Sequence, residues 1–419
     1  MDFNGTLENG VELYTCLNPN LSAFCLSLWV RRGSMHEPRE AHGLAHFLEH
    51  AIFRSISERM GGQLYPTLRR LGLDFDASTY TGYVRFEISG LAGHFDAAAD
   101  ILLMALDVPT MSLEGMRLER LRVQTEIREE ASEETADYFA NSRVWRGTPL
   151  ARSIAGTKHA TNLIGFQALN EEHARWFSPG NFFFCLTGNA PDAAGFARRL
   201  AAIRVTGDAP VIERAPVPEG FFHRDAAVEV QDSAYPWLRF CFDVDTSRHS
   251  EMAHIILVDY LLGDLGRLYM ELSEYTGLVY NLNDYFERFS NIGCLCFDFE
   301  VEPAQLLRAV DVVVDVLNDA KRVDAPDLLD FMAGGAKDDR IKEDYVCTFN
   351  NYWGYDNGLR HCGFHSADER RAAYAAVTPA EIAALAREVF TPDNAILCVR
   401  GNKRRIDVEA IHSRLLRLG

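Results

Sequence analysis

The segment His46-Phe47-Leu48-Glu49-His50 carries the clearest chemical potential in this chain of 419 residues. In a helix, side chains four residues apart lie one turn apart on the same face, so His46 and His50 can direct ring nitrogens at one ion. Imidazole nitrogen is a common ligand of Zn²⁺, and Glu49 lies close enough to take a proton from an attacking water. The pattern therefore predicts a zinc-dependent hydrolase, with His46 and His50 as ligands and Glu49 as the catalytic base.

A purely structural interpretation of this pentapeptide stays open. A chain with 13 histidines can contain the spacing by chance, with Phe47 and Leu48 packed inward and both histidines acting as ordinary polar residues. The flanking residues from 41 to 53 are mostly apolar between the polar groups, which is typical of a buried helix that carries a site. We therefore favour the functional interpretation.

A catalytic zinc ion usually has three protein ligands, so a third residue must come from elsewhere in the chain. The segment from Met116 to Ala140 is predicted to be a helix rich in acids, most of which must be solvated surface charges. Glu119 and Glu126 lie seven residues apart and share one face of that helix. Composition alone does not select among its acids, which are Glu119, Glu126, Glu129, Glu130, Glu133 and Glu134.

The composition limits the class of protein. Hydrophobic residues make up 47% of the chain, as in a folded globular protein, and the formal net charge is −18. That charge, without a basic stripe, argues against nucleic acid as a partner. The chain has no apolar run of about 18 residues, and its start lacks a signal-peptide pattern, so we expect a cytoplasmic protein with no membrane partner. The nine cysteines lie mostly in strand-like apolar runs and are expected to be reduced packing residues.

The elements that must position these residues fall into two halves. Residues 207–220 are rich in proline and glycine and predict a linker between an N-terminal zinc-binding domain, 1–206, and a homologous C-terminal domain without a metal site, 221–419. The segment 177–189 aligns without gaps to 390–402, with Phe, Pro, Asn, Cys, Gly and Asn at matching positions. A helix precedes each copy, and strands at 24–30 and 237–243 match at the same offset.

This repeat predicts an α+β fold of two duplicated domains, each with a mostly antiparallel or mixed sheet and helices packed on one face. In the first domain we expect the histidine helix, a second helix near 57–71 and strands between 75 and 89. Long helices are expected at 94–106 and 112–140.

These motifs resemble the pitrilysin and insulysin family of zinc peptidases, in which HxxEH is followed further along the chain by a glutamate ligand. The resemblance implies that Glu126 is the third ligand and that Glu119 is a supporting acid for a histidine ligand. It implies a zinc endopeptidase with one Zn²⁺ per chain, acting on short or unfolded peptides. Leader or precursor peptide processing is one use open to such an enzyme. The similarity continues through 32–37 and 266–280 and covers nearly the whole chain.

The resemblance also implies how a peptide would bind. An extended peptide is expected to add as a strand beside the segment Asp76, Ala77, Ser78, Thr79 and Tyr80, where the family usually has asparagine at the position of Asp76. At the start of the motif helix His42 stands where asparagine is common, so a third histidine ligand and a capping role both stay open.

Family members carry in the second domain an arginine and a tyrosine seven residues apart, which hold the substrate and the developing oxyanion. Here Tyr280 is present, but the arginine position is Ser273. Two chains or two fused halves of this family close around a chamber, so a second subunit could donate the missing pair. We therefore expect the catalytic subunit of a heterodimer, with a homodimer as the alternative. A non-catalytic scaffold or peptide-binding subunit is the alternative from another class, and the complete zinc set argues against it.

Overall fold

The computed structural model describes residues 3–129, 135–211, 214–234, 236–324 and 326–419, and side chains are not described at 326 and 336–339. It divides into two compact units. The first takes in Met1–Glu133, Arg152–Glu213 and Arg340–Glu369, and the second takes in Glu134–Ala151, Arg214–Asp339 and Arg370–Gly419. Residues 212 and 213 of the predicted linker and 130–134 of the predicted helix at 112–140 lie outside the described residues.

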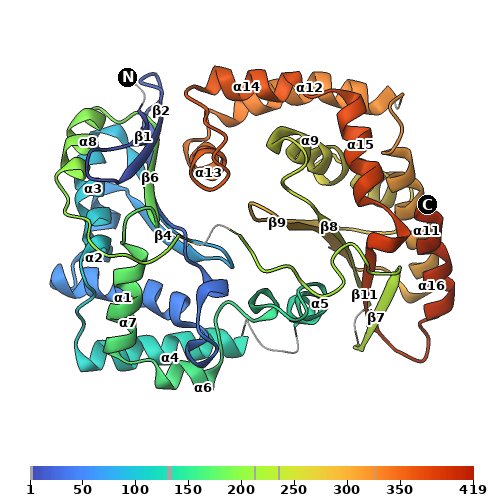
Figure 1. The fold of residues 1–419 in the computed structure, drawn as a ribbon, viewed down its shortest axis with the longest axis horizontal. Coiled ribbons are helices and arrows are strands. Elements are labelled where there is room, and N and C mark those ends of the chain that lie inside the picture. Colours follow the sequence, from blue (N-terminus) through green and yellow to red (C-terminus); the bar gives the residue numbers. More distant parts are fainter. Residues whose placement is uncertain (1–2, 130–134, 212–213, 235, 325) are drawn as a thin grey trace. The chain divides into compact units, whose positions relative to one another are not determined.

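A mixed sheet with the order β1-β2-β6-β3-β5-β4 is the frame of the first unit (Figure 1). Its pairs are antiparallel except for β2 with β6, which are parallel. β4 lies at one edge and pairs only with β5 among the described strands. The strands are β1 (Asn4–Thr6), β2 (Glu12–Leu17), β3 (Ala23–Val30), β4 (Asp74–Thr79), β5 (Val84–Leu91) and β6 (Phe182–Gly188).

Alternating residues of these strands face two different layers. Leu26, Leu28 and Phe184 belong to the main hydrophobic core, to which the helices α1, α3 and α7 contribute side chains. The helices of the unit are α1 (Leu44–Arg59), α2 (Leu64–Leu71), α3 (Phe95–Leu103), α4 (Leu113–Glu129), α6 (Lys158–Leu163), α7 (Phe166–Trp176) and α8 (Ala193–Ala201). Short 3₁₀ turns connect several of them.

The opposite face of this sheet is covered by α13 (Val346–Gly354), the orange helix beside β6 in Figure 1. Trp29 and Phe183, whose side chains alternate with those of the main core, pack with Phe349 and Trp353 of that helix. Asn350 of α13 donates hydrogen bonds to the carbonyls of Cys25 and Cys185. A segment from the second half of the sequence thus completes the first unit.

The second unit repeats this plan around a sheet with the order β7-β11-β8-β10-β9. Its strands are β7 (Ala227–Asp232), β8 (Trp237–Val244), β9 (Asn283–Arg288), β10 (Gly293–Phe299) and β11 (Ala395–Gly401). Its helices are α5 (Ala136–Val144), α9 (Glu251–Leu262), α10 (Arg267–Tyr269, continued by a π turn over Met270–Glu274), α11 (Leu306–Asp319), α12 (Pro326–Lys342), α14 (Ala367–Ala376), α15 (Pro379–Val389) and α16 (Val408–Leu415). The last residues of α12 and the first of α14 belong to the first unit.

The two copies of the predicted repeat have the same structure. α7 and α15 each lead through a proline turn into a central strand, β6 or β11. The matching Asn181 and Asn394 are fully buried, and their amides hold backbone carbonyls near those turns. The prediction of an α+β fold with duplicated domains is therefore confirmed.

Two details differ from the expected order of elements. The predicted helix at 112–140 is divided, because Thr135 is extended and caps α5, which begins at Ala136 as part of the other unit. The predicted helix at 57–71 is also divided, since α1 runs on to Arg59 and α2 begins at Leu64. The two units do not coincide with the two halves of the sequence on either side of the predicted linker. α5 comes from the first half but packs on the second sheet, and α13 comes from the second half but packs on the first sheet.

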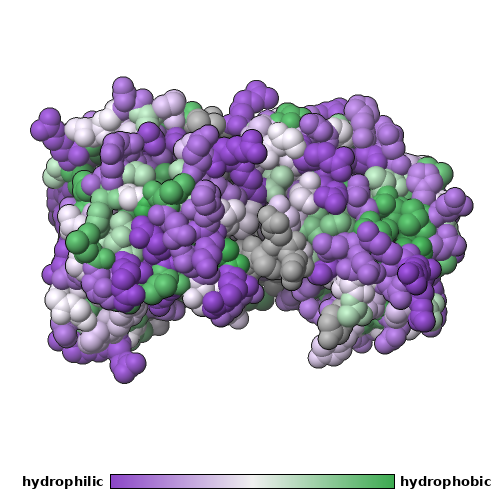
Figure 2. Space-filling model, turned by 90° about the horizontal axis from the view of Figure 1, so that it is seen from below, coloured by the Kyte–Doolittle hydropathy of each residue, from purple (hydrophilic) through white to green (hydrophobic). Residues whose placement is uncertain are grey.

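The face seen in Figure 2 is mostly hydrophilic, with apolar residues gathered in small groups. Within the described part of the chain, no helix combines the length and the apolar character needed to cross a membrane.

Candidate metal centre

The histidine motif lies on α1, whose N-terminus is fixed by a tight turn. Gly43 precedes the helix with φ of +92°, and a Cβ there would come within 2.7 Å of the Ala155 carbonyl oxygen, so the position requires glycine. The buried carboxylate of Glu37 accepts hydrogen bonds from the backbone amides of Gly43, at 2.7 Å, and Ala45, at 2.6 Å. Its oxygens satisfy amides at the helix start that have no partner within the helix, and burial raises the pKa of Glu37 to about 8. Glu37 therefore fixes the start of the helix that carries the motif.

Three of the predicted residues converge on one point. The ligand atoms of His46, His50 and Glu126 all lie within 4.8 Å of one another. His46 Nε2 is 3.1 Å from Glu126 Oε1, and His50 Nε2 is 3.4 Å from Glu126 Oε2. Tetrahedral coordination with bonds of about 2.0–2.1 Å places neighbouring ligand atoms about 3.3 Å apart, so the donor set fits a zinc ion. The helix α4 supplies Glu126 because it packs against α1.

Glu119 lies seven residues before Glu126 on the same face of α4. It contacts His50 at the ring nitrogen that does not face Glu126. Its buried carboxylate is 3.2 Å from His50 Nδ1 and accepts a hydrogen bond from Arg54 Nε at 2.8 Å. Carboxylates that bind the second nitrogen of a metal-ligating imidazole orient the ring and increase its basicity. The structure therefore leaves His50 Nε2 free to face Glu126 while Nδ1 is fixed.

The charges of this cluster are strongly coupled. Burial lowers the pKa of His50, but the hydrogen bonds to Glu119 and Glu126 outweigh it and raise the pKa to about 9. Hydrogen bonds from His46 and His50 hold the pKa of Glu126 well below its usual range. Burial raises the pKa of Glu119, but its bonds with His50 and Arg54 outweigh this and lower it. The site thus favours positive charge between the two imidazoles and the Glu126 carboxylate, as a divalent cation would supply.

Glu49 is buried on α1, and its carboxylate is held by the edge strand. Thr79 Oγ1 at the end of β4 donates a hydrogen bond of 2.7 Å to Glu49 Oε2. This contact joins the predicted base to the segment Asp76, Ala77, Ser78 and Thr79, of which Asp76 is exposed and the others are half-buried. The outer edge of β4 is unpaired among the described strands.

A cavity of about 330 Å³ lies next to this cluster. Glu119 and Arg54 form part of its wall, and apolar side chains from α1, α2 and α4 form most of the rest. The lining residues are Phe53, Arg54, Ser57, Tyr65, Leu118, Glu119 and Arg122.

The other predicted residues have different surroundings. His42 Nε2 contacts the backbone carbonyl of Ser153, and burial lowers its pKa, so its ring serves the loop before α1 and is absent from the ligand set formed by the described residues. Ser273 is half-buried in the π turn of the second unit, and Tyr280 is 95% exposed there. Their roles in substrate binding stay predictions.

Sequence reasoning missed Arg54, Glu37 and the link between Thr79 and Glu49. Arg54 lies four residues after His50, which is a helical spacing that could have indicated it. The Glu37 cap and the Thr79 bond join residues from a loop and a strand to the helix, and no local pattern reveals such contacts.

Comparisons with known proteins agree with this geometry. Residues 17–158 match the family described as Insulinase (Peptidase family M16), and residues 164–327 match the domain described as Peptidase M16 inactive domain. The uncharacterized zinc protease YmxG of Bacillus subtilis is 23% identical over 323 residues, which are 76% of this chain and 78% of that protein.

Solved structures share the fold. A protease from Helicobacter pylori superposes with a TM-score of 0.81 at 15% identity, over 96% of this chain and 99% of that chain. The periplasmic protease PqqL from Escherichia coli has a TM-score of 0.76 at 14% identity, over 100% of this chain and 50% of that chain.

Proposed function

Because the chain belongs to the insulinase family of peptidases, family M16, we propose that it is a zinc-dependent endopeptidase that hydrolyses peptide bonds in short or unfolded peptides. The convergence of His46, His50 and Glu126 beside the buried carboxylate of Glu49 is the observation that carries the proposal. One zinc ion per chain, held by those three residues, would polarise a substrate carbonyl and lower the pKa of water. The names of relatives as zinc proteases support this choice of metal.

Glu49 acts as the general base in this proposal. Its carboxylate takes a proton from the attacking water and delivers it to the amine of the leaving peptide. Thr79 holds one carboxylate oxygen by its hydrogen bond, so the other oxygen can face the water. Glu119 is a positioning residue, because it acts through His50 and does not touch the reacting groups.

The peptide would bind as a strand beside β4. Hydrogen bonds to the backbone of Asp76–Thr79 would fix the scissile bond without reading sequence, which suits a peptidase of broad substrate range. Side-chain preference would then come from pockets such as the 330 Å³ cavity beside Glu119, whose apolar walls and arginines suit a large side chain with a polar end. Leader or precursor peptides are one class of substrate that such a site could process.

We place the chain in a dimer, as the catalytic subunit. The chain aligns with half of PqqL, which is consistent with a pair of such units forming one functional body. Ser273 stands where the family carries arginine, so a partner chain could supply the arginine and tyrosine that complete the substrate clamp, and Tyr280 would be this chain's own contribution. If the purified chain alone cleaves peptides as fast as it does with any second family subunit, the heterodimer proposal is wrong and a homodimer or monomer replaces it.

A non-catalytic scaffold or peptide-binding subunit is the second candidate. The match of residues 164–327 to a domain described as inactive is the observation that favours it. Zinc analysis of protein purified without added metal, coupled to an assay with a quenched fluorescent peptide, separates the two candidates. Stoichiometric zinc with hydrolysis supports the peptidase, and peptide binding without hydrolysis supports the scaffold.

Glu49→Gln is the decisive variant for the mechanism. It keeps the shape of the side chain and removes its basicity, so kcat should fall about 10²–10⁴-fold while one zinc ion stays bound. Glu171→Gln, at an exposed position of α7 where the carboxylate accepts a hydrogen bond from Gln167, is the matched control and should keep wild-type activity. Full hydrolysis by a zinc-loaded Glu49→Gln variant would refute the role of Glu49.

A further inference from the structure

Another cluster of side chains with metal-ligating atoms belongs to the second unit. Cys241 on β8 is the direct cross-strand partner of Cys296 on β10, and Cys294 lies two residues earlier on β10. Residues two apart on a strand point to the same face, so the three thiols share one face of the sheet. The pattern is invisible as a motif because it depends on the register of two strands distant in sequence.

The three thiols are close enough to share one ion. Their sulfur atoms all lie within 4.8 Å of one another, and Cys294 Sγ is 3.4 Å from Cys296 Sγ. Three sulfurs bound to one metal at about 2.3 Å would lie about 4 Å apart, so the site needs only a small adjustment. All three residues are at most 5% exposed, and α5 packs on the neighbouring strands β8 and β11.

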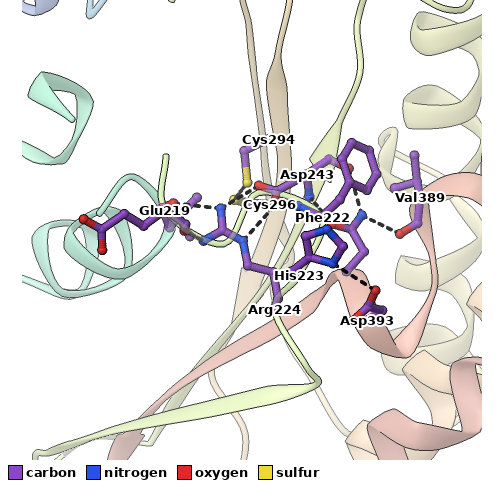
Figure 3. A network of polar contacts seen from close by, with 11 residues as sticks. Glu219, Phe222, His223, Arg224, Asp243, Cys294, Cys296, Val389 and Asp393 are labelled. Carbon is purple, nitrogen blue, oxygen red and sulfur yellow. Dashed lines mark hydrogen bonds and ion pairs between the residues drawn. The ribbon is translucent and has the colours of Figure 1, made fainter. Parts of the chain in front are cut away.

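Buried guanidiniums lie at both ends of the cluster. Arg239, two residues before Cys241, donates a hydrogen bond of 2.9 Å to Asp298. At the other end Arg224 forms a two-pronged ion pair with Asp243, which Figure 3 shows beside Cys294 and Cys296. Each guanidinium is already paired with a carboxylate, so these ion pairs border the thiols with polar groups and add no net positive charge.

We propose that Cys241, Cys294 and Cys296 bind one thiophilic metal ion, and that Cu(I) is the ion the site fits best. Thiolates are soft ligands that select Cu(I), zinc and iron–sulfur clusters over hard cations. Structural zinc almost always takes four ligands, and no fourth histidine, cysteine or carboxylate of the described residues joins this group. A three-sulfur site therefore favours an ion that accepts three ligands. The nitrogen and oxygen donors of His46, His50 and Glu126 form a chemically different site.

The test is an anaerobic titration of the full-length, zinc-loaded chain with Cu(I), in competition with a coloured Cu(I) chelator. We expect one tightly held Cu(I) per chain, and X-ray absorption at the copper edge should show a first shell of sulfur only. Loss of a residue that contacts a metal ligand, without touching the metal, typically weakens metal binding about 10–100-fold. Cys294→Ser removes a ligand itself, so it should weaken Cu(I) binding at least about 100-fold. Cys185→Ser is the matched control, because this buried cysteine lies on β6 in the first unit, outside the group, and should leave Cu(I) binding unchanged.

Several results would overturn the proposal. They are the absence of tight Cu(I) binding, a copper shell of nitrogen and oxygen atoms, and equal effects of Cys294→Ser and Cys185→Ser. If Cys294→Ser does not fold, the absorption spectrum of the wild-type chain decides, since it needs no variant. A sulfur shell found around zinc in the purified chain, with no exchange for Cu(I), would refute the choice of copper. Peptide hydrolysis is measured separately, so failure of the peptidase proposal does not affect the outcome.

Discussion

Replacing Glu119 by glutamine tests whether the metal centre depends on its supporting carboxylate. Glu119 has a side chain only 3% exposed, and it joins His50 Nδ1 to Arg54 across the interface of α1 and α4. Glutamine keeps the length and can still accept one hydrogen bond, but it removes the negative charge. Arg54, whose side chain is 29% exposed, is then left with solvent as its main partner.

The expected loss of zinc affinity comes from the two contacts of Glu119, with His50 and with Arg54, which no longer involve a negative charge in the variant. Loss of an outer carboxylate typically weakens metal binding by about 10–100-fold, which is about 1.4–2.7 kcal/mol. Because glutamine retains one acceptor oxygen toward His50, we expect the middle of that range, about 30-fold in the zinc dissociation constant. Hydrolysis at saturating zinc should largely recover, since Glu119 does not touch the reacting groups.

A chelator-competition assay at pH 7.5 measures this affinity, and peptide hydrolysis at increasing free zinc measures the recovery. Glu114→Gln is the matched control: Glu114 lies on the same helix, its side chain is 62% exposed, and it pairs with Arg117. The reasoning is wrong if Glu119→Gln binds zinc as tightly as wild type, or if Glu114→Gln weakens binding equally. Lost activity that excess zinc does not restore would instead place Glu119 in the chemistry.

Two further predictions concern other parts of the first unit. Thr79→Val removes the hydrogen bond to Glu49, worth about 1 kcal/mol, so kcat should fall roughly five-fold with little change in KM; an unchanged kcat in steady-state assays would exclude this positioning role. Burial outweighs the bond to the Ala105 carbonyl and lowers the pKa of His173 to about 4. As the pH falls, His173 is therefore protonated in the unfolded chain before it is protonated in the folded chain. The contribution of neutral His173 to the free energy of unfolding is lost as the pH falls from about 6.5 toward 4. Between pH 7.5 and 5 the loss should be about 2 kcal/mol in urea unfolding relative to His173→Gln. Parallel pH profiles for the two proteins would contradict it.

The sequence predicted the local part of the metal site well. A separation of four residues on a helix is a local geometric fact, so His46, Glu49 and His50 could be placed on one turn before any fold was known. The spacing of Glu119 and Glu126 put both on one face but could not assign their roles. The structure separates them by burial: Glu119 is enclosed between α1 and α4 with Arg54, and Glu126 is partly exposed and faces both imidazoles.

The features that were not predicted depend on contacts between segments that are distant in sequence. Asn350 and its helix α13 reach the first sheet from more than three hundred residues away, as the spacing of 325 between Asn350 and Cys25 shows. Hydrophobic periodicity identifies such a helix but gives no information on which sheet it covers. The cysteine cluster could not be predicted for the same reason, because Cys241 and Cys296 lie side by side only through the register of β8 and β10. Patterns read along the chain predicted these cysteines as separate packing residues.

The duplication shows which parts of the fold serve the frame and which serve the chemistry. Both units retain the central strand pair and the buried asparagine after the proline turn, so these features maintain the shared architecture. The helices that follow the matching strands β3 and β8 differ completely. α1 carries the His46 motif, whereas α9 has the sequence EMAHIILVDYLL, in which His254 is the only histidine. With one imidazole and no glutamate beside it at the motif spacing, α9 cannot form the same donor set. Zinc binding is therefore expected in the first unit only, and grafting the residues of α1 onto α9 without the supporting acids of α4 should not create a second zinc site.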